Sequence, residues 1–310
     1  MRTALTALTD ELRRLKTAGV KTITVSDESI AVLRRVIVAR NSGVRKPERG
    51  KTDQVSLSAA PKLYEPPPVS IRSPVSAIRH PAASAPMPAP PTVALPAGDK
   101  QTRWDALLAL VQNDPVCRAH VRPGKKVVLG VGNLDAKIMF VGEAPGADEE
   151  VQGEPFVGPA GQLLTKMIQG MGLKRSDVYI GNIMNWRPEL PTSGNGEQYG
   201  NRPPTEAEMR YCLPYLRAQI EVVAPELLVA LGSTAAQGLL GFGSFKALGD
   251  IRGRWAEFAG KPLMVTYHPS YILRNQSNRS KRMIWEDLLK VMERAALPIS
   301  DKQRGFFLDK

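Results

Sequence analysis

The chain has 310 residues, with 42 Lys and Arg against 30 Asp and Glu, a formal net charge of +12, and only 3 His and 2 Cys. No apolar run is long and uncharged enough to span a membrane, and acids interrupt the first helical pattern. We therefore expect neither a membrane span nor a secretory signal, and we expect a cytoplasmic protein. Two cysteines exclude a disulfide framework and a self-contained four-thiolate metal site.

The first third of the chain differs from the rest in charge and composition. Residues 1–100 contain 16 basic and 8 acidic residues, and leucines from Leu5 to Leu15 recur at helical spacing. Eleven of the 26 prolines lie between Pro61 and Pro96, among Ala, Ser and Val. We predict a small helical appendage over residues 1–40, with or without a docking partner, and a disordered linker over 41–102. The surplus charge favours a polyanion such as nucleic acid, or serves solubility alone.

From Trp104 onward, short apolar runs alternate with helical patterns. The predicted strands are 136–141, 178–183, 227–231 and 263–267. The predicted helices are 161–171, 205–223, 233–240 and 281–296. This alternation favours a three-layer α/β/α fold around a central, mainly parallel four-stranded sheet, in a domain over 103–298 followed by a C-terminal tail over 299–310. Ligands of such sheets bind beyond the carboxyl ends of the strands, so functional side chains are expected there.

Four polar or aromatic side chains lie at or near the predicted strand ends. Glu143 belongs to a tight turn after the first strand, Phe156 follows it, Asn182 ends the second strand and His268 follows the fourth. Taken singly, each has an ordinary interpretation as a solvated acid, a core ring, a turn residue or a loop histidine. Together they predict one crevice in which Asn182 pairs with the edge of a pyrimidine and Phe156 stacks on the base.

Five linked segments carry a family resemblance. They are Gly-Glu-Ala-Pro-Gly at 142–146, Pro-Phe-Val-Gly with Ala-Gly-Gln-Leu-Leu between 155 and 164, Tyr-Ile-Gly-Asn at 179–182, Asn-Arg-Pro-Pro at 201–204, and His-Pro-Ser-Tyr-Ile-Leu-Arg at 268–274. In this order they resemble the family 4 uracil-DNA glycosylases, over about residues 105–297. The resemblance implies a hydrolase of base excision repair that cleaves the N-glycosidic bond of uracil in damaged DNA and leaves an abasic site.

The resemblance also implies the roles of single residues in the crevice. Glu143 would position or polarise the attacking water, and His268 would donate a hydrogen bond to uracil O2 as negative charge develops there. Gly142, Phe156 and Asn182 would bind the substrate base, by close approach of the turn, by stacking and by reading the uracil edge. Glycosidic cleavage separates a cationic sugar from an anionic base, so these residue types suit the reaction.

A second set of residues is implied to contact the DNA. Ser270, Tyr271 and Arg274 match the segment that enters or braces the duplex as the base leaves the stack. Extruding a base costs less in single strands and mismatches, so we expect single-stranded or mismatched uracil-containing DNA as the partner of a monomeric enzyme. The mechanism requires no organic cofactor.

The chain departs from the family at its metal cluster. Family 4 members hold a 4Fe-4S cluster with four cysteines, of which only Cys117 and Cys212 are matched here. The other two positions hold Asp114 and Trp186. Because two thiolates cannot hold the usual cluster, we expect that the cluster is lost, that no metal is bound, and that Trp186 fills its place.

Three smaller features complete the sequence pattern. The segment 189–200 lengthens the loop after Arg187 and is interpreted as a surface insertion or a DNA contact; it has no histidine, so covalent trapping of DNA is not expected. Ala144 stands where the best-known branch of the superfamily has a water-activating Asp, which leaves Glu143 as the only carboxylate of the turn. The acids 148–150 are expected to form a solvated helix start.

Two alternative functions remain open from the sequence. A catalytically weak DNA-binding protein of the same fold would have lost the chemistry together with the cluster. A glycosylase with a shifted base preference, for hypoxanthine or xanthine, would keep the fold and the reaction, because the sequence does not define the width of the pocket.

Overall fold

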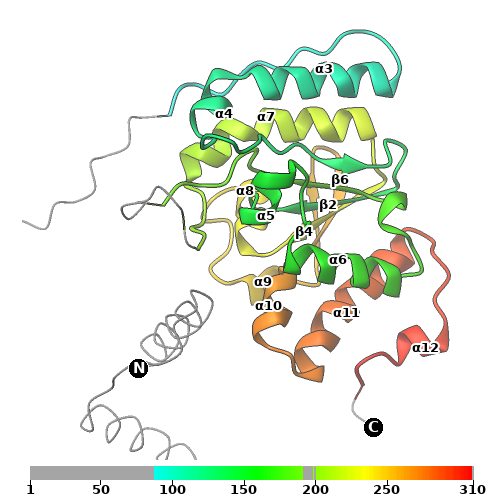
Figure 1. Cartoon of the computed structure of the whole chain (residues 1–310). Coiled ribbons are helices and arrows are strands. Elements are labelled where there is room, and N and C mark those ends of the chain that lie inside the picture. Colours follow the sequence, from blue (N-terminus) through cyan, green and yellow to red (C-terminus); the bar gives the residue numbers. More distant parts are fainter. Residues whose placement is uncertain (1–86, 191–197, 199, 309–310) are drawn as a thin grey trace, which may run out of the picture. The chain divides into compact units, whose positions relative to one another are not determined.

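The computed structural model describes residues 87–190, 198 and 200–308, all within one compact unit that spans 78–310 (Figure 1). The appendage predicted over 1–40, most of the linker predicted over 41–102 and most of the 189–200 loop lie outside the described residues. In the described ranges, no helix combines the length and the apolar character that crossing a bilayer requires.

A six-stranded sheet with the order β1-β3-β2-β4-β6-β5 forms the centre of the fold. The four central strands, β3 (Tyr179–Asn182), β2 (Ile138–Gly142), β4 (Leu227–Leu231) and β6 (Lys261–Thr266), run parallel to one another. They confirm the predicted parallel sheet. Every residue of β2, β3 and β4 is buried, as expected for strands covered on both faces.

Two antiparallel edge strands add to the predicted sheet. The short strand β1 (Val131–Gly132) pairs with β3, and β5 (Trp255–Phe258) pairs with β6. The β5-β6 hairpin turns through Ala259 and Gly260, which both have positive φ. Such a two-residue turn matches the twist of a hairpin.

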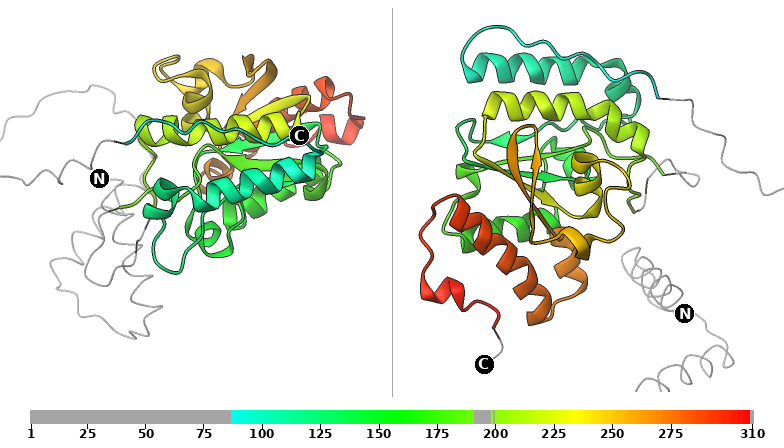
Figure 2. Two further views of the ribbon diagram at one scale, coloured as in Figure 1. Left: turned by 90° about the horizontal axis from the view of Figure 1, so that it is seen from above. Right: turned by 180° about the vertical axis from the view of Figure 1, so that it is seen from behind.

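Helices cover both faces of the sheet, which gives the predicted three layers (Figures 1 and 2). On one face lie α7 (Glu206–Val223) and α8 (Ser233–Leu240), and α3 (Lys100–Asn113) packs along α7. On the other face lie α6 (Pro159–Gly170) and α11 (Asn278–Arg294). The remaining helices are short: α4 (Pro115–Ala119), α5 (Ala147–Gln152), the 3-10 turn η1 (Arg175–Asp177), α9 (Leu248–Ile251), α10 (Pro269–Arg274) and α12 (Asp301–Arg304).

Ordered structure extends beyond the predicted domain 103–298 at both ends. Within the predicted linker, Met87, Val93 and Leu95 pack against the core, and α3 begins at Lys100. Within the predicted tail, the Gln303 carbonyl accepts a hydrogen bond of 2.6 Å from the Trp285 indole, and α12 thereby lies against α11. Apolar packing at the first end, and this hydrogen bond together with the packing of Phe306 against the core at the second, extend the compact region.

Candidate active site

The carboxyl ends of the central strands open into a cavity of about 710 Å³. It is lined by seven of the eight predicted site residues: Glu143, Phe156, Asn182, His268, Ser270, Tyr271 and Arg274. They come from the end of β2, the loop before α6, the end of β3, and α10 with its N-cap. Residues far apart in the sequence therefore meet in one cleft, as the parallel sheet predicts.

The eighth predicted residue, Gly142, lies against two of the others. It pairs with Asn182 in the β2-β3 register. A Cβ atom at Gly142 would lie 2.3 Å from Asn182 Oδ1 and 2.5 Å from the Phe156 ring. Only glycine permits this close approach, so Gly142 sets the position of both side chains.

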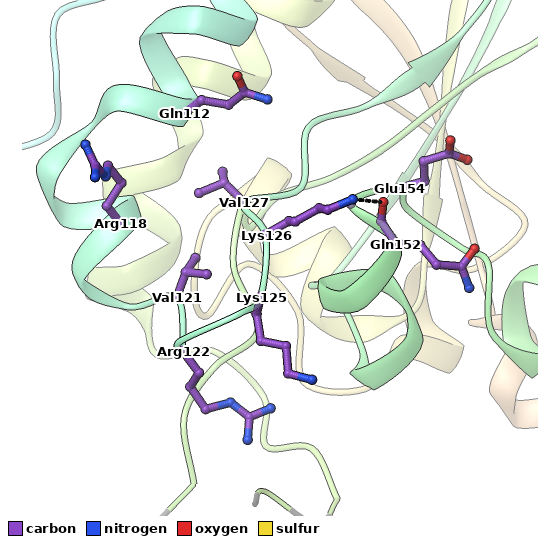
Figure 3. Close-up of a pocket in the computed structure, with 10 residues that line it drawn as sticks. Gln112, Arg118, Val121, Arg122, Lys125, Lys126, Val127, Gln152 and Glu154 are labelled. Atoms are coloured by element: carbon purple, nitrogen blue, oxygen red, sulfur yellow. Dashed lines mark hydrogen bonds between the residues drawn. The ribbon is translucent and has the colours of Figure 1, made fainter. Parts of the chain in front are cut away.

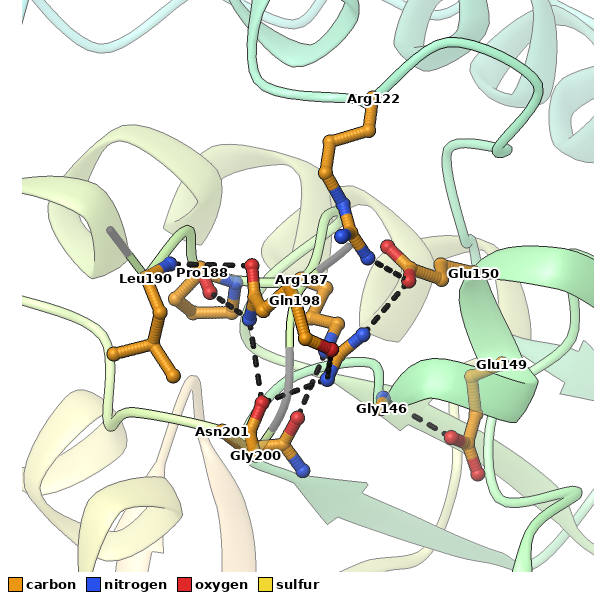
Figure 4. Close-up of polar contacts among 10 residues, drawn as sticks. All are labelled: Arg122, Gly146, Glu149, Glu150, Arg187, Pro188, Leu190, Gln198, Gly200 and Asn201. Atoms are coloured by element: carbon orange, nitrogen blue, oxygen red, sulfur yellow. Dashed lines mark hydrogen bonds and ion pairs between the residues drawn. The ribbon is translucent and has the colours of Figure 1, made fainter. Parts of the chain in front are cut away.

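Phe156 is held in a strained backbone conformation. Its φ is 55°, in the left-handed region that few non-glycine residues adopt, and its side chain is 6% exposed. The Glu149 carboxylate accepts hydrogen bonds of 3.0 Å from the backbone N–H groups of Val157 and Gly158. It accepts a third, also 3.0 Å, from Gly146 in the turn after β2 (Figure 4). Glu149 therefore ties the loop that carries Phe156 to the β2 turn.

Asn182 offers an unpaired acceptor to the cleft. The residue is 5% exposed, and its Oδ1 has no hydrogen-bond partner among the described residues. Leaving a buried acceptor unpaired costs about 1–3 kcal/mol. A bound ligand with an N–H group would remove this cost, and the amide N–H₂ of Asn182 offers a donor beside the acceptor.

His268 is held as a neutral donor. Its Nδ1 accepts a hydrogen bond of 3.2 Å from the Ser270 backbone N–H and lies 2.9 Å from Ser270 Oγ, which accepts from Arg274 Nη1 at 3.2 Å. Because Nδ1 is the acceptor, the neutral ring carries its proton on Nε2. Burial, with a smaller effect of the Arg274 charge, lowers the pKa of His268 to about 4. The imidazole is therefore uncharged near pH 7 and lies 5.6 Å from the Phe156 ring.

Glu143 is the carboxylate that the β2 turn places in the cleft. Burial raises its pKa above the ordinary value, and a hydrogen bond with Thr234 of α8 acts in the opposite direction. The Glu143 backbone carbonyl accepts a hydrogen bond of 3.1 Å from Met184, which fixes the turn to the segment after β3. A carboxylate so placed can hold a water molecule or face a developing positive charge.

The predicted DNA-contacting segment forms helix α10 at the rim of the cleft. The Tyr271 ring stacks on Tyr267 with 4.3 Å between the ring centroids, and both side chains line the cavity. Leu273 is 42% exposed, although it is apolar. Tyr267 before the helix and Tyr271 and Arg274 within it thus line the cleft, and α10 also carries an exposed leucine.

Sequence reasoning missed a buried ion network beside the cleft (Figure 4). The guanidinium of Arg187 donates to Glu150 at 2.8 Å, to Asn201 Oδ1 at 2.8 Å and to the Gly200 carbonyl at 2.7 Å. Arg122 forms a second ion pair with Glu150. The network holds Asn201, which lines the cavity.

The expectation of a solvated helix start at 148–150 is wrong for Glu149 and Glu150. Glu149 is bonded to three backbone N–H groups, and Glu150 is buried between two arginines. The sequence of three consecutive acids, 148–150, does not indicate which partners bury Glu149 and Glu150. The signal that could have found the network is the Asn-Arg-Pro-Pro motif, since it contains Asn201.

The four positions matched to the cluster cysteines converge on one buried place between α4 and α7. The Asp114 carboxylate accepts hydrogen bonds of 2.8 Å from the hydroxyls of Tyr211 and Tyr215 and one of 2.7 Å from the Cys117 backbone N–H. We call the Asp114 carboxylate and its three donors, from Tyr211, Tyr215 and Cys117, the Asp114 network. Although burial raises the pKa of Asp114, these hydrogen bonds together lower it below its ordinary value.

The donor set at this place does not fit a 4Fe-4S cluster. A 4Fe-4S cluster takes four thiolates, and only two of the four positions, Cys117 and Cys212, hold a thiol. Trp186 offers no metal ligand; its indole is 1% exposed and stacks on His120 with 5.0 Å between the ring centroids. Within the described part of the chain, no group of three or more His, Cys, Asp or Glu is placed to hold a metal ion.

Comparisons with known proteins find one family model and several relatives that match this chain. A family model described as the uracil DNA glycosylase superfamily matches residues 129–289, which include all eight predicted site residues. A type-4 uracil-DNA glycosylase of Thermotoga maritima is 41% identical over 181 residues, 58% of this chain and 88% of that protein. One of Archaeoglobus fulgidus is 43% identical over 152 residues, 47% of this chain and 71% of that protein. A type-5 uracil-DNA glycosylase of Pyrobaculum aerophilum is 31% identical over 180 residues, 53% and 73%.

Proposed function

Because the chain belongs to the uracil-DNA glycosylase superfamily, we propose that it hydrolyses the N-glycosidic bond of uracil in DNA and leaves an abasic site. The observation that carries the proposal is the meeting of Glu143, Phe156, Asn182 and His268 in one cleft. The superfamily model matches residues 129–289, which contain the residues of this cleft, and relatives named type-4 uracil-DNA glycosylases are 41% and 43% identical to the chain.

The proposed mechanism stabilises the two charges that bond cleavage separates. His268 Nε2–H donates to uracil O2 as the base becomes an anion, and Glu143 faces the cationic sugar and holds the water that attacks it. Asn182 accepts from the uracil ring N–H and donates to the adjacent carbonyl, while Phe156 stacks on the base. A neutral His268 suits its role, because a donor with a pKa of about 4 in the free site keeps its proton configuration across the neutral range.

Uracil release tests the proposal. Wild-type protein and the Glu143→Ala, His268→Ala double variant are compared on single-stranded and U:G oligonucleotides. We expect release by the wild type and a loss of several orders of magnitude in the double variant. Equal release by both proteins would contradict the proposal and favour a DNA-binding protein without the chemistry. Release of hypoxanthine or xanthine in preference to uracil would show a shifted base preference.

The finer features of the substrate are also proposals. Action on single-stranded or mismatched DNA is favoured because an unpaired base costs less to extrude. We propose that the protein acts as a monomer in the cytoplasm. Rates on single-stranded, U:G and U:A substrates, the mass in solution and cell fractionation test these three points; faster release from U:A than from U:G would contradict the first.

We propose that the reaction proceeds without the 4Fe-4S cluster. The support is the donor set, in which a carboxylate and an indole stand at two of the four positions and the carboxylate is bonded to two hydroxyls. Iron analysis of purified protein should give no stoichiometric iron, and a brown chromophore would contradict the proposal. The Asp114→Cys, Trp186→Cys double variant is the matched comparison, because it restores four cysteines and should gain iron if the backbone still suits a cluster.

A further inference from the structure

A second cavity, of about 570 Å³, lies next to α4 and the loop that follows it (Figure 3). Its lining contains four cationic side chains and one acid, in the set Gln112, Arg118, Val121, Arg122, Lys125, Lys126, Val127, Gln152, Gly153 and Glu154. Four positive charges against one negative charge give the cavity a positive potential, which attracts an anion.

Two of the four cationic side chains already have partners within the protein. Arg122 pairs with Glu150, and Lys126 Nζ donates to the Gln152 carbonyl at 3.2 Å, at the carboxyl end of α5. The side chains of Arg118 and Lys125 form no hydrogen bond or ion pair with any described residue. These two cations are available to a ligand.

The arrangement of the cations favours an extended anion over a compact one. In Figure 3, the Arg118 and Lys125 side chains, which both line the cavity, point in different directions. A site for one small anion would direct its donors at a single point. Cations that spread along a rim can instead contact successive phosphates of a nucleic acid strand.

The second cavity lies close to the active-site cleft. Asp148 and Glu149 at the start of α5 line the cleft, and Gln152 at its end lines the second cavity. These six helical residues, Ala147–Gln152, span about 9 Å at 1.5 Å per residue. The side chains of Arg122, Glu150, Arg187 and Asn201 also connect the two cavities by direct contacts. At roughly 3.4 Å per phosphate along a strand, a strand leaving the cleft would reach the second cavity within a few nucleotides.

We propose that the basic cavity binds the phosphate backbone of the DNA strand that flanks the nucleotide in the cleft. The assignment to DNA rests on the proposed function. The Asp114 network supports the contact from inside, because Asp114 caps the start of α4 and so fixes the helix that carries Arg118. The place that holds a cluster in the family here anchors part of the proposed DNA path.

The test measures how binding depends on salt. The full-length Arg118→Ala, Lys125→Ala variant is compared with wild type and with Lys174→Ala, Lys302→Ala. The control removes the same charge from two exposed lysines whose side chains have no bonded partner among the described residues: Lys174 precedes β3 at the sheet end away from the cleft, and Lys302 lies on α12. Fluorescence anisotropy with uracil-free single-stranded DNA of about 30 nucleotides gives the binding constant at each salt concentration. The slope of its logarithm against the logarithm of the salt concentration is then compared between the proteins.

Loss of two phosphate contacts should make that slope shallower by about 1.4, since each contact to a single strand contributes about 0.7. The control slope should stay within about 0.3 of wild type. An unchanged slope in Arg118→Ala, Lys125→Ala, or an equal change in the control, would overturn the proposal. Charge reversal, Arg118→Glu with Lys125→Glu, should weaken binding further, and a failure to do so would also count against it.

Uracil release separates this proposal from the proposed function. On a trinucleotide with uracil in the middle, the single flanking nucleotide on each side spans roughly 3.4 Å, too little to reach the second cavity, so the Arg118→Ala, Lys125→Ala variant should release uracil at the wild-type rate. On about 30 nucleotides its KM should rise and its kcat should stay the same. If neither the wild type nor any variant releases uracil but the salt slopes of binding differ as expected, the proposed function is wrong and the proposed binding surface is supported. An equal rise in KM on both lengths would overturn the binding surface alone.

Discussion

The active-site cleft and the Asp114 network both bury polar groups, but they satisfy them differently. In the cleft, Asn182 Oδ1 is unpaired, the pKa of Glu143 is raised and the pKa of His268 is lowered to about 4. In the Asp114 network, one carboxylate accepts three hydrogen bonds and its pKa is lowered. A buried unpaired acceptor beside groups whose burial shifts their pKa away from the charged form is typical of a site prepared for a ligand, whereas a buried carboxylate with three donors is typical of structure.

Two groups depart from this division, because Asn185 Oδ1 and Trp186 Nε1 also lie buried outside the cleft without a partner among the described residues. Trp186 Nε1 is a buried donor without a partner among the described residues, although it lies beside the Asp114 network. Its ring is covered by His120 at 5.0 Å and by Tyr211 at 6.3 Å. The indole fills volume there, and its packing offsets the cost of the unpaired donor.

The largest expected effect is on base reading in the cleft. Asn182→Asp removes the amide donor and adds a negative charge near a base that becomes an anion, so uracil release should slow by about 10³-fold. Asn201→Asp is the control, because Asn201 also lines the cavity but bonds to Arg187. Single-turnover uracil release measures the rate of both variants. Equal losses of rate would show that the unpaired amide of Asn182 is no more important for the reaction than the paired amide of Asn201.

A smaller loss is expected when the close approach at the β2 turn is blocked. Gly142→Ala places a Cβ against Asn182 and Phe156 and displaces both, which should slow uracil release by about 10²-fold. Gly249→Ala is the control, since nothing lies within 4 Å of a Cβ there. Full activity of Gly142→Ala in the same assay would mean that uracil release does not depend on the positions of Asn182 and Phe156.

The Asp114 network should affect stability and not chemistry. Asp114→Ala leaves two buried hydroxyls without their acceptor and removes the α4 cap, so the free energy of unfolding should fall by about 3 kcal/mol. Tyr215→Phe removes one hydroxyl and should cost about 1 kcal/mol. Denaturant unfolding measures both. A drop in uracil release per folded molecule would show that the network takes part in the cleft.

A further modest effect, smaller than that of Asp114→Ala, is a pH dependence of stability. The folded pKa of His268, about 4, lies below its ordinary value of 6.5, so the unfolded chain takes up a proton between these values that the folded chain does not. Stability is therefore lost as pH falls through this window, by about 1.4 kcal/mol between pH 7.5 and 5.5. Asp287, with its pKa raised to about 6, acts in the opposite direction.

Comparison with His268→Gln isolates this effect. The difference in the free energy of unfolding between the two proteins, followed by denaturant unfolding, cancels the contribution of Asp287. A pH-independent difference would mean that His268 titrates normally in the folded protein and that its ring is not held neutral.

The central strands and the cleft were predictable because apolar runs and strand ends are local signals. Leu227–Leu231 and Ser233–Leu240 form the predicted elements with the same bounds. The edge strand Trp255–Phe258 was not predicted, because it is short and alternates little, and its hairpin turns on Ala-Gly instead of Asn-Gly.

The parts that the sequence does not predict depend on distant partners. Glu150 is buried by Arg122 and Arg187, which lie 28 and 37 residues away in the chain. Asp114 meets its tyrosines 97 and 101 residues later. Such pairings leave no periodic pattern, so their acids are indistinguishable from solvated ones until the fold brings the partners together.

The position of uracil in a crystal of the protein tests the central claim most directly. We expect that the base lies on the Phe156 ring, that its ring N–H donates to Asn182 Oδ1, and that its O2 accepts from His268 Nε2. Uracil bound outside this cleft, or bound in it with Asn182 Oδ1 still unpaired, would contradict the account.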